Sequence, residues 1–194
     1  MSFRIVNLTA ENEPAVRQAA ELLVEGFREC TPEAWPTLGS ALEEVRDSLG
    51  PDRISRVALT EDGTVLGWIA GQCHYDGHVW ELHPLVVQAR CRLRGIGRAL
   101  VADLEARVAE RGGITLWLGT DDQDGRTSLF GVDLYPDPLA HLARLRNLRG
   151  HPFEFYQKLG FAVAGVVPDA NGPGKPDILM AKRVEARPPA TEPS

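Results

Sequence analysis

A basic, glycine-containing turn in the middle of the chain has residue types suited to holding an anion. The apolar run that begins at Leu85 is followed by Arg92, Gly95 and Gly97. Glycines let backbone N–H groups approach a phosphate closely, and the start of a helix presents the positive end of its dipole to the same charge. Arginine adds charge-assisted contacts. The spacing therefore predicts a strand, an anion-binding turn and a helix.

The spacing Arg-x-x-Gly-x-Gly after an apolar strand resembles the loop with which the GNAT superfamily of N-acetyltransferases holds the pyrophosphate of acyl-coenzyme A. Two other motifs are excluded, because no Gly-Lys-Ser/Thr follows as a P-loop requires, and a dinucleotide fingerprint needs a third glycine. The resemblance implies acetyl-CoA as cosubstrate. The residues expected to contact it here are Leu85, Val86, Val87, Arg92, Leu93, Arg94, Gly95, Ile96, Gly97 and Arg98.

Just before this loop, Glu81 and His83 alternate with Leu82. In a strand this spacing places both polar side chains on one face, beside the expected coenzyme loop. Pro84 cannot donate to the ladder, which predicts a bulge or distorted pairing. Such distortion leaves backbone N–H groups available to a thioester carbonyl, and the N–H of Leu85 is the candidate oxyanion donor.

Glu81 is the candidate general base. Acyl transfer to an amine needs a neutral nitrogen, but alkyl amines are protonated at neutral pH. A carboxylate can bind the ammonium form and accept its proton, directly or through water. The structural alternative is a satisfied salt bridge at Glu81 with a core histidine at His83.

Tyr156 lies in a segment, Phe155-Tyr156-x-Lys-x-Gly-Phe161, that resembles the GNAT helix–strand junction whose tyrosine faces the thiol sulfur. The resemblance implies that Tyr156 contacts the coenzyme and gives a proton to the departing thiolate. The alternative is one more aromatic side chain on a buried helix. Seven residues before the tyrosine, many GNAT members have asparagine; Arg149 stands here, and Asn147 is a candidate substitute for contacting the pantetheine arm.

Carboxylates and one tryptophan form a candidate substrate surface. Acidic side chains at strand ends beside an acetyl site would attract a polycation, although a solvated acidic loop is the alternative. Trp35 is a candidate for stacking on a sugar ring or, alternatively, a packing anchor. The residues expected to contact substrate, with Glu81, are Glu33, Trp35, Asp121, Asp122 and Asp133.

Several further segments resemble the aminoglycoside 6'-N-acetyltransferases within the GNAT superfamily. They run through about the last three-fifths of the chain: Trp80–Val87, Leu118–Asp122, Asp133–Tyr135, His151–Tyr156, Val166–Gly172 and Lys175–Asp177. The resemblance implies direct transfer of acetyl from acetyl-CoA to the 6'-amine of an aminoglycoside in a ternary complex, antibiotic resistance, and often a homodimer. It places Glu81 as base or ammonium-positioning carboxylate, His83 and Leu85 near the acetyl group, and Tyr156 as thiolate proton donor.

The elements that must position these residues follow from periodicity and turn signals. A helix over residues 95–111 should bury Ile96, Leu100, Val101, Leu104 and Val108, and Ser40-Ala41-Leu42-Glu43 reads as the capping box of another. Further helices are expected at residues 13–28, 139–148 and 152–159. Strands are expected at residues 3–8, 54–60, 64–73, 78–87, 114–118, 161–167 and 177–184. Asp-Gly turns make the second, third and fourth strands an antiparallel meander, and the fifth should run parallel to the fourth.

The order βααβββαβ(α)αββ matches the GNAT fold, an α/β (α+β) class with a mixed central sheet of about seven strands flanked by helices. We expect one domain over residues 1–185 and a disordered, proline-bearing tail over residues 186–194. The net charge of −6 argues against nucleic acid as a partner, and no apolar run is long enough to span a membrane.

Cys30, Cys73 and Cys91 form no Cys-x-x-Cys pair, and hairpin geometry separates His74, His78 and His83, so no metal is expected. Free thiols and the lack of a signal-peptide apolar region favour a cytoplasmic protein. Two alternative functions stay open. One is acetylation of another amine, such as a polyamine, a small metabolite or a protein N-terminus; the other is a non-catalytic acyl-CoA-binding module, which would need neither Glu81 nor Tyr156.

Overall fold

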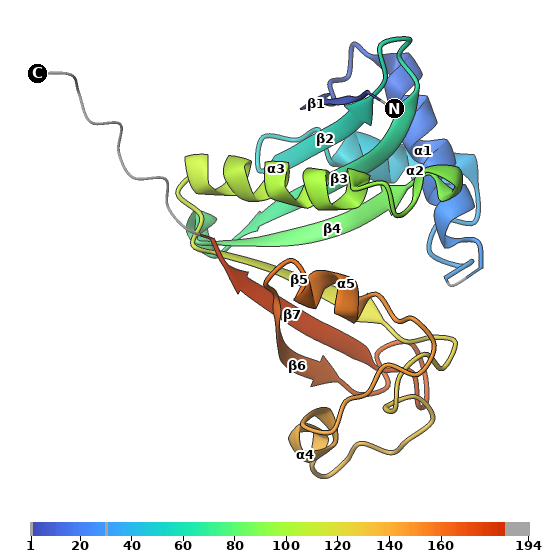
Figure 1. The fold of residues 1–194 in the computed structure, drawn as a ribbon, viewed down its shortest axis with the longest axis vertical. Helices are drawn as coiled ribbons and strands as arrows, with labels where there is room; N and C mark the ends of the chain where they lie inside the picture. Colours follow the sequence, from blue (N-terminus) through green and yellow to red (C-terminus); the bar gives the residue numbers. More distant parts are fainter. Residues whose placement is uncertain (1, 30, 185–194) are drawn as a thin grey trace, which may run out of the picture. The chain divides into compact units, whose positions relative to one another are not determined.

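The computed structural model describes residues 2–29 and 31–184. The expected tail at residues 186–194 and Cys30 lie outside this part of the chain. The elements, labelled in Figure 1, are β1 (Arg4–Asn7), α1 (Glu13–Phe27), α2 (Leu38–Asp47), β2 (Arg53–Leu59), β3 (Val65–His74), η1 (Tyr75–Gly77), β4 (Val79–Val87), η2 (Ala89–Cys91), α3 (Ile96–Glu110), β5 (Thr115–Asp121), α4 (Pro138–Leu142), α5 (Phe153–Gln157), β6 (Ala162–Val167) and β7 (Asp177–Arg183).

The strands form one mixed sheet in the order β1-β2-β3-β4-β5-β7-β6. Strands β1 to β4 pair antiparallel with their neighbours, which confirms the predicted meander, and β6 pairs antiparallel with β7. The sequence of helices and strands also confirms the predicted order. The parallel direction of β5 beside β4 stays a prediction.

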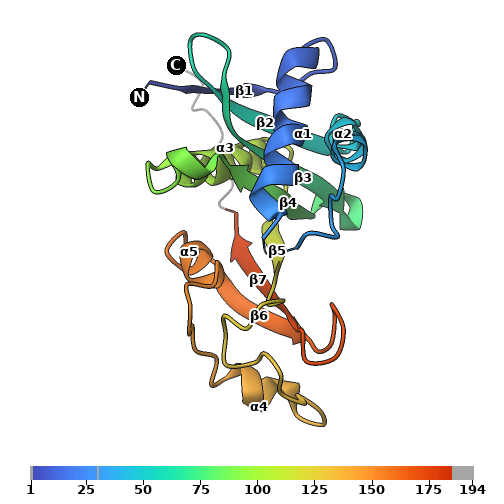
Figure 2. The ribbon, with the colours of Figure 1, turned by 90° about the vertical axis from the view of Figure 1, so that its right-hand side faces the viewer.

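The fold divides into two compact units. The first contains the described parts of Met1–Gly26, Pro36–Leu116 and Arg183–Ser194, and the second contains those of Phe27–Trp35 and Trp117–Lys182. In the first unit, α1 and α2 cover one face of strands β1 to β4, and α3 covers the other (Figures 1 and 2).

Glycines allow the helices of the first unit to approach the sheet closely. A Cβ at Gly26 of α1 would lie 2.6 Å from Val86 Cγ2, and one at Gly71 of β3 would lie 2.8 Å from Leu104 Cδ1 on α3. Both distances are shorter than real Cβ contacts. Val86 therefore packs against α1, while α3 lies over the glycines on the opposite face.

Helix α3 agrees closely with its prediction. All five residues expected to face inward are buried, as the 3.6-residue periodicity requires: Ile96, Leu100, Val101, Leu104 and Val108. Gly95 precedes the helix with φ 84°, a left-handed conformation that glycine adopts without steric cost.

The predicted capping box of α2 is wrong by three residues. Thr37 is the N-cap, because its side-chain oxygen accepts the backbone N–H of Ser40, and the Ser40 hydroxyl accepts the backbone N–H of Thr37 in return. Ser40 is thus the third helical residue, not the cap. The reciprocal bonds satisfy two backbone donors at the start of the helix.

In the second unit, the helix predicted at residues 139–148 is shorter than expected. Helix α4 ends at Leu142, because the following segment pairs with another part of the chain instead. Arg146 N–H donates to Ser128 Oγ and Leu148 N–H donates to Arg126 O, so residues 146–148 run beside residues 126–128. These tertiary bonds compete with helix continuation.

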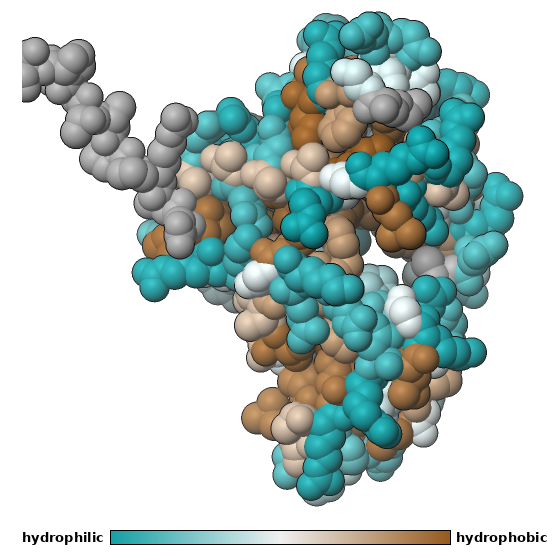
Figure 3. Space-filling model, viewed as in Figure 1, coloured by the Kyte–Doolittle hydropathy of each residue, from teal (hydrophilic) through white to brown (hydrophobic). Residues whose placement is uncertain are grey.

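The described residues contain no helix long and apolar enough to cross a membrane. Hydrophilic side chains cover much of the face in Figure 3, with apolar side chains between them. The exposed large apolar side chains are Tyr75, Leu93, Ile114, Phe130, Tyr135, Leu139, Leu148 and Val167.

Candidate active site

Strand β4 contains the predicted irregularity at Pro84. Leu82 lies opposite Gly71 of β3, but Leu85 lies opposite Ile69, so three steps on β4 match two steps on β3. The extra residue is a bulge at His83–Pro84, where the peptide bond is cis. As a consequence Leu82 and Leu85 share the α3 face of the sheet, although they are an odd number of residues apart.

The backbone of Leu85 has an N–H that points away from β3. Gln88 N–H donates to Leu66 O of β3 at 2.9 Å, and the register from there is Gly67–Val87, Trp68–Val86 and Ile69–Leu85. Donors alternate sides along an antiparallel strand, so Val86 N–H points toward β3. The N–H groups of Leu85 and Val87 then point the other way, toward the side of β4 on which β5 lies.

Glu81 is a half-buried carboxylate with a histidine partner. Its Oε2 lies 3.1 Å from His74 Nε2, and 23% of the Glu81 side chain is exposed. Leu82 beside it is buried and His83 is exposed, in agreement with the predicted alternation. His74 was not among the predicted site residues. The turn Tyr75-Asp76-Gly77 was the available signal, since it sets the register that makes the two side chains neighbours.

The loop from Gln88 to Arg98 has the features of an anion-binding turn. Arg92, Arg94 and Arg98 are exposed. Leu93 (φ 61°) and Gly95 (φ 84°) have left-handed backbone conformations within this turn. Ala99 N–H donates to Gly95 O, while the earlier amides at the start of α3 have no carbonyl within the helix to bind.

The same loop is braced from within. The side-chain carbonyl of Gln88 accepts a hydrogen bond from Arg90 Nε at 3.0 Å and a weaker one from Cys91 Sγ at 3.4 Å. Cys91 is buried. Gln88 therefore stabilises the turn between β4 and α3 and binds Arg90. The later arginines of the loop are the exposed cations next to the start of α3: Arg92, Arg94 and Arg98.

A buried ion pair ties α3 to the sheet. Arg56 of β2 is 8% exposed, and its guanidinium donates to both carboxylate oxygens of Asp103 on α3, at 2.5 and 3.1 Å. It also bonds to Asn7 Oδ1 of β1. A two-point contact of this kind restricts the orientation of α3 on β2. The helix that carries the anion-binding amides is thus held by charge as well as by apolar packing.

Tyr156 is buried in an aromatic cluster of the second unit. Its ring meets Phe155 and Phe161 edge to face, with ring centroids 5.0 and 5.7 Å apart. Burial raises the pKa of Tyr156 well above its ordinary value, because the phenolate would be poorly solvated there. The hydroxyl is therefore protonated at neutral pH and can act as a hydrogen-bond donor.

His151 positions the helix that carries Tyr156. The N–H of Phe153 donates to His151 Nδ1 at 3.2 Å, so Nδ1 is unprotonated and Nε2 carries the hydrogen, which it donates to Asp121 O at 3.0 Å. Burial is the main cause that lowers the pKa of His151. The neutral ring thus joins the start of α5 to the end of β5.

The two residues weighed for a pantetheine contact are both engaged in shaping loops. Asn147 Nδ2 donates to His151 O at 3.0 Å, and its Oδ1 accepts His151 N–H at 2.8 Å. Arg149 donates to the carbonyls of Asp124 and Gly125. Neither side chain replaces the family's asparagine in an obvious way, so the pantetheine contact at this position stays a prediction.

Asp121 and Asp122 are neighbours with different environments. Asp122 is fully buried, and its two oxygens accept the N–H groups of Arg126 and Thr127 at 2.8 and 2.7 Å. This geometry favours a role in shaping the loop over the predicted contact with substrate. Asp121 is exposed, and Asn171 Nδ2 donates to its Oδ1 at 2.5 Å.

The remaining predicted substrate residues also lie in the second unit. Asp133 is exposed, and one of its oxygens accepts the N–H of Tyr135 at 3.0 Å. Trp35 packs edge to face on Phe27, with ring centroids 4.8 Å apart, as a packing anchor would. Glu33 is exposed in the same loop.

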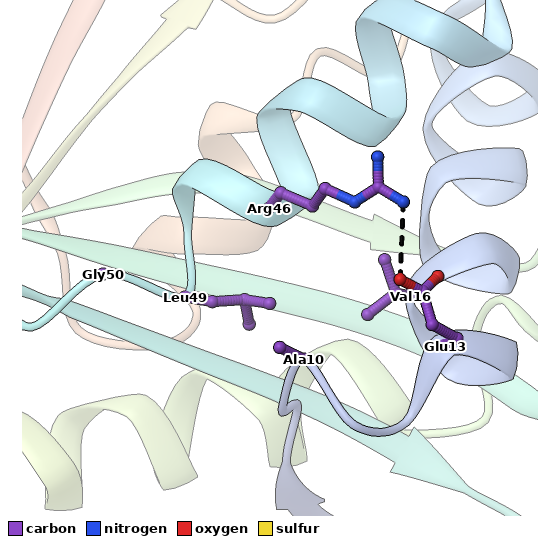
Figure 4. A pocket seen from close by; sticks show the side chains of 6 residues that line it. All are labelled: Ala10, Glu13, Val16, Arg46, Leu49 and Gly50. Atoms are coloured by element: carbon purple, nitrogen blue, oxygen red, sulfur yellow. Dashed lines mark hydrogen bonds and ion pairs between the residues drawn. The ribbon is translucent and has the colours of Figure 1, made fainter.

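Two surface hollows have no predicted site residue among the residues that line them. One, of about 370 Å³, is crossed by an ion pair between Glu13 Oε1 and Arg46 Nη2 at 3.4 Å (Figure 4). The other, of about 540 Å³, is lined by Ser128, Leu129, His141, Arg144, Leu145 and Arg146.

The structure gathers the predicted residues into two groups, one in each unit. Glu81, His83 and the segment Leu85–Arg98 belong to the first unit, and Tyr156 belongs to the second with the predicted substrate residues of loops 27–35 and 121–133. Within residues 2–29 and 31–184, no group of three or more His, Cys, Asp or Glu side chains is placed to hold a metal ion. Cys73 and Cys91 are free thiols.

Comparison with known structures gives close matches over nearly the whole chain. A crystal structure of aminoglycoside 6'-N-acetyltransferase complexed with coenzyme A is 43% identical, with a TM-score of 0.86, and the match covers 95% of this chain and 99% of that one. The aminoglycoside 6'-N-acetyltransferase from Enterococcus faecium is 42% identical (TM-score 0.83), and aminoglycoside 6'-acetyltransferase type Ii is 39% identical (TM-score 0.71), with the same coverage.

No curated protein matches the chain. The family model described as "Acetyltransferase (GNAT) family" matches residues 20–130, which is more than half of the sequence and includes the bulged strand and the whole anion-binding loop. The chain belongs to the GNAT family of acetyltransferases.

Proposed function

We propose that this protein transfers an acetyl group from acetyl-CoA to the 6'-amine of an aminoglycoside antibiotic by direct attack, and so confers resistance. The observation that carries the proposal is similarity of about 40% identity, over 95% of the chain, to aminoglycoside 6'-N-acetyltransferases. Matches at this level preserve site chemistry as well as fold, whereas fold alone would leave the amine open.

The loop of the first unit fits the coenzyme. The pyrophosphate would accept hydrogen bonds from the amides between Leu93 and Arg98, at the positive end of α3, and Arg92 and Arg94 would add charge. The outward backbone groups of Leu85 and Val87 would bind the amides of the pantetheine arm. Val86 contributes through its place in the strand, because its side chain packs against Gly26.

Glu81 is the proposed base. Its carboxylate attracts the ammonium form of the amine and takes one proton, directly or through water, and the neutral nitrogen then attacks the carbonyl carbon of the thioester. Negative charge develops on the carbonyl oxygen, where the N–H of Leu85 can donate. The carbon–sulfur bond breaks, and the electron pair leaves on the thiolate. His83 would line the acetyl group.

Tyr156 is the proposed donor to that thiolate. Its raised pKa keeps the phenol protonated during the reaction. A hydrogen bond from the hydroxyl stabilises the charge on sulfur as the carbon–sulfur bond breaks. The nitrogen loses a second proton as the amide forms, so the ammonium group gives up two protons in all. One equals the proton that the thiol finally carries, and the other is released from Glu81 to solvent.

The substrate is a polycation, and the exposed carboxylates suit it. Asp121 and Asp133 would pair with further ammonium groups, together with Glu33, and Trp35 would border a sugar ring while it remains packed on Phe27. Asp122 would act indirectly, by holding the loop that carries Asp121. A homodimer, which rests on the family resemblance, and a cytoplasmic location, which rests on the free thiols, are further parts of the proposal.

A panel assay tests the proposal. Purified protein is mixed with acetyl-CoA and, in separate wells, kanamycin-type antibiotics with a 6'-amine, the matching 6'-hydroxyl antibiotics, polyamines and peptides, and free thiol is measured. We expect turnover only with the 6'-amines. Faster polyamine or peptide turnover would contradict the proposed substrate, and tight acetyl-CoA binding without any turnover would support a binding module. Size-exclusion chromatography tests the dimer.

A further inference from the structure

The hairpin β3–β4 places a second titratable side chain directly on the proposed base. His74 Nε2 lies 3.1 Å from Glu81 Oε2. We propose that His74 is a positioning residue, which holds the Glu81 carboxylate in the orientation needed to take a proton from the amine. This inference rests on the proposed function, because it requires Glu81 to act as the base.

The pairing is a consequence of strand register. His74 lies opposite Val79, and Gln72 lies opposite Glu81, so His74 and Glu81 are diagonal neighbours on one face of the hairpin. The short turn η1 connects the strands here and leaves little freedom for a register shift. The two side chains are thus brought together by the backbone and not only by their mutual attraction.

The direction of the hydrogen bond follows from chemistry. An ionised carboxylate only accepts, so Nε2 of His74 must carry the hydrogen and donate it to Oε2. Among the described residues Glu81 Oε1 has no hydrogen-bond partner. One oxygen is therefore held by the protein while the other remains for the ammonium group, which is the arrangement that a positioned base needs.

The residue opposite Glu81 on β3, Gln72, is itself hydrogen-bonded to a neighbouring strand. Arg53 of β2 lies opposite Gln72, and Arg53 Nη1 donates to Gln72 Oε1 at 2.6 Å. That bond directs the Arg53 guanidinium to the side chain of Gln72, the residue opposite Glu81. The side chains of His74 and Glu81 are 32% and 23% exposed, so the pair is only partly screened by solvent.

Kinetics of single and double variants test the role. In His74→Ala we expect kcat for a 6'-amine aminoglycoside to fall about tenfold, because a loosened base is misplaced, with KM for acetyl-CoA unchanged. His74→Gln keeps an N–H donor and should stay within about threefold of wild type. In a Glu81→Ala background, His74→Ala should change kcat less than twofold, since its effect passes through Glu81.

The matched control is His78→Ala, which alters an exposed histidine of the same hairpin and should leave kcat unchanged. Equal losses from His74→Ala with and without Glu81 would overturn the proposal, as would a His74→Gln variant as slow as His74→Ala. A wild-type rate indistinguishable from background with every aminoglycoside would instead reject the proposed function.

An NMR measurement that needs no turnover distinguishes failure of the proposed His74–Glu81 pairing from failure of the proposed function. In ¹⁵N-edited NMR of the wild type at neutral pH, we expect the His74 ring to be the Nε2–H tautomer, and we expect Glu81→Ala to change its nitrogen shifts. An Nδ1–H tautomer, or shifts that Glu81→Ala does not alter, would contradict the pairing whatever substrate the enzyme accepts.

Discussion

At the residue scale, Glu81 offers the sharpest test of the proposed chemistry. Glu81→Gln keeps the size of the side chain but removes its ability to take a proton. We expect kcat/KM for the aminoglycoside to fall about 10²-fold or more, because the amide of glutamine cannot accept the proton of the ammonium group.

The measurement is initial thiol release at one fixed pH with saturating acetyl-CoA. The matched control is Glu61→Gln, which alters an exposed carboxylate in the β2–β3 turn. A Glu81→Gln variant with the wild-type kcat/KM would show that another group accepts the proton.

Local pattern identified Glu81 but not its surroundings. Alternation along a strand and the proline at position 84 are local signals, and both the partly exposed face and the bulge follow from them. The difference in burial between Asp121 and Asp122, in contrast, has no local signal in the sequence. Two adjacent aspartates look alike in sequence, and only the tertiary turn of residues 122–127 buries one of them on backbone N–H groups.

At the element scale, the β4–α3 loop predicts how the coenzyme is held. Arg92→Ala removes one exposed cation beside the amides of α3, and we expect coenzyme A to bind about tenfold more weakly, because a charge-assisted hydrogen bond to phosphate is lost. Binding should also depend less steeply on salt. Calorimetry at two or more salt concentrations measures both effects.

Arg144→Ala is the matched control for that experiment, since Arg144 is equally exposed but lies outside the loop. Unchanged affinity in Arg92→Ala would place the pyrophosphate elsewhere.

The sequence predicted a helix correctly where one face of the helix is buried along its whole length. It was less accurate where a short segment can form tertiary hydrogen bonds in place of helical ones. The periodicity of α3 predicted every buried position. The helix expected at residues 139–148 ends early, because the last three of those residues pair with residues 126–128 instead. The start of α2 was misplaced because Thr37 and Ser40 are both good caps, and the choice depends on the path of the preceding loop.

At the scale of the whole molecule, the chain segments of the two units are interleaved. Residues 27–35 group with residues 117–182. Three of the four boundaries fall inside α1, β5 and β7, and the fourth lies in the loop between α1 and α2. No change in composition marks such boundaries, so the sequence predicted the order of elements correctly without revealing this grouping. The single domain expected over residues 1–185 stays a prediction.

The buried side chain of His151, which takes part in no proposed catalytic step, should make the free energy of unfolding depend on pH. Burial lowers the pKa of His151 below the ordinary value of about 6.5, so the unfolded chain binds a proton more readily than the folded one. The stabilisation is complete above about pH 6.5 and is lost as the pH falls below it, because protonated Nδ1 cannot accept the N–H of Phe153. One proton changes the free energy of unfolding by at most about 1.4 kcal/mol per pH unit.

Urea unfolding between pH 7.5 and 5 measures this dependence, with His151→Gln as the comparison, since glutamine can accept and donate but does not titrate. We expect the free energy of unfolding of the wild type to fall more steeply on acidification than that of His151→Gln. Parallel curves for the two proteins would mean that His151 is not held neutral by the fold. The Trp35 and Trp117 environments report on the unit that contains His151, and those of Trp68 and Trp80 on the other, so single-tryptophan variants show which unit responds.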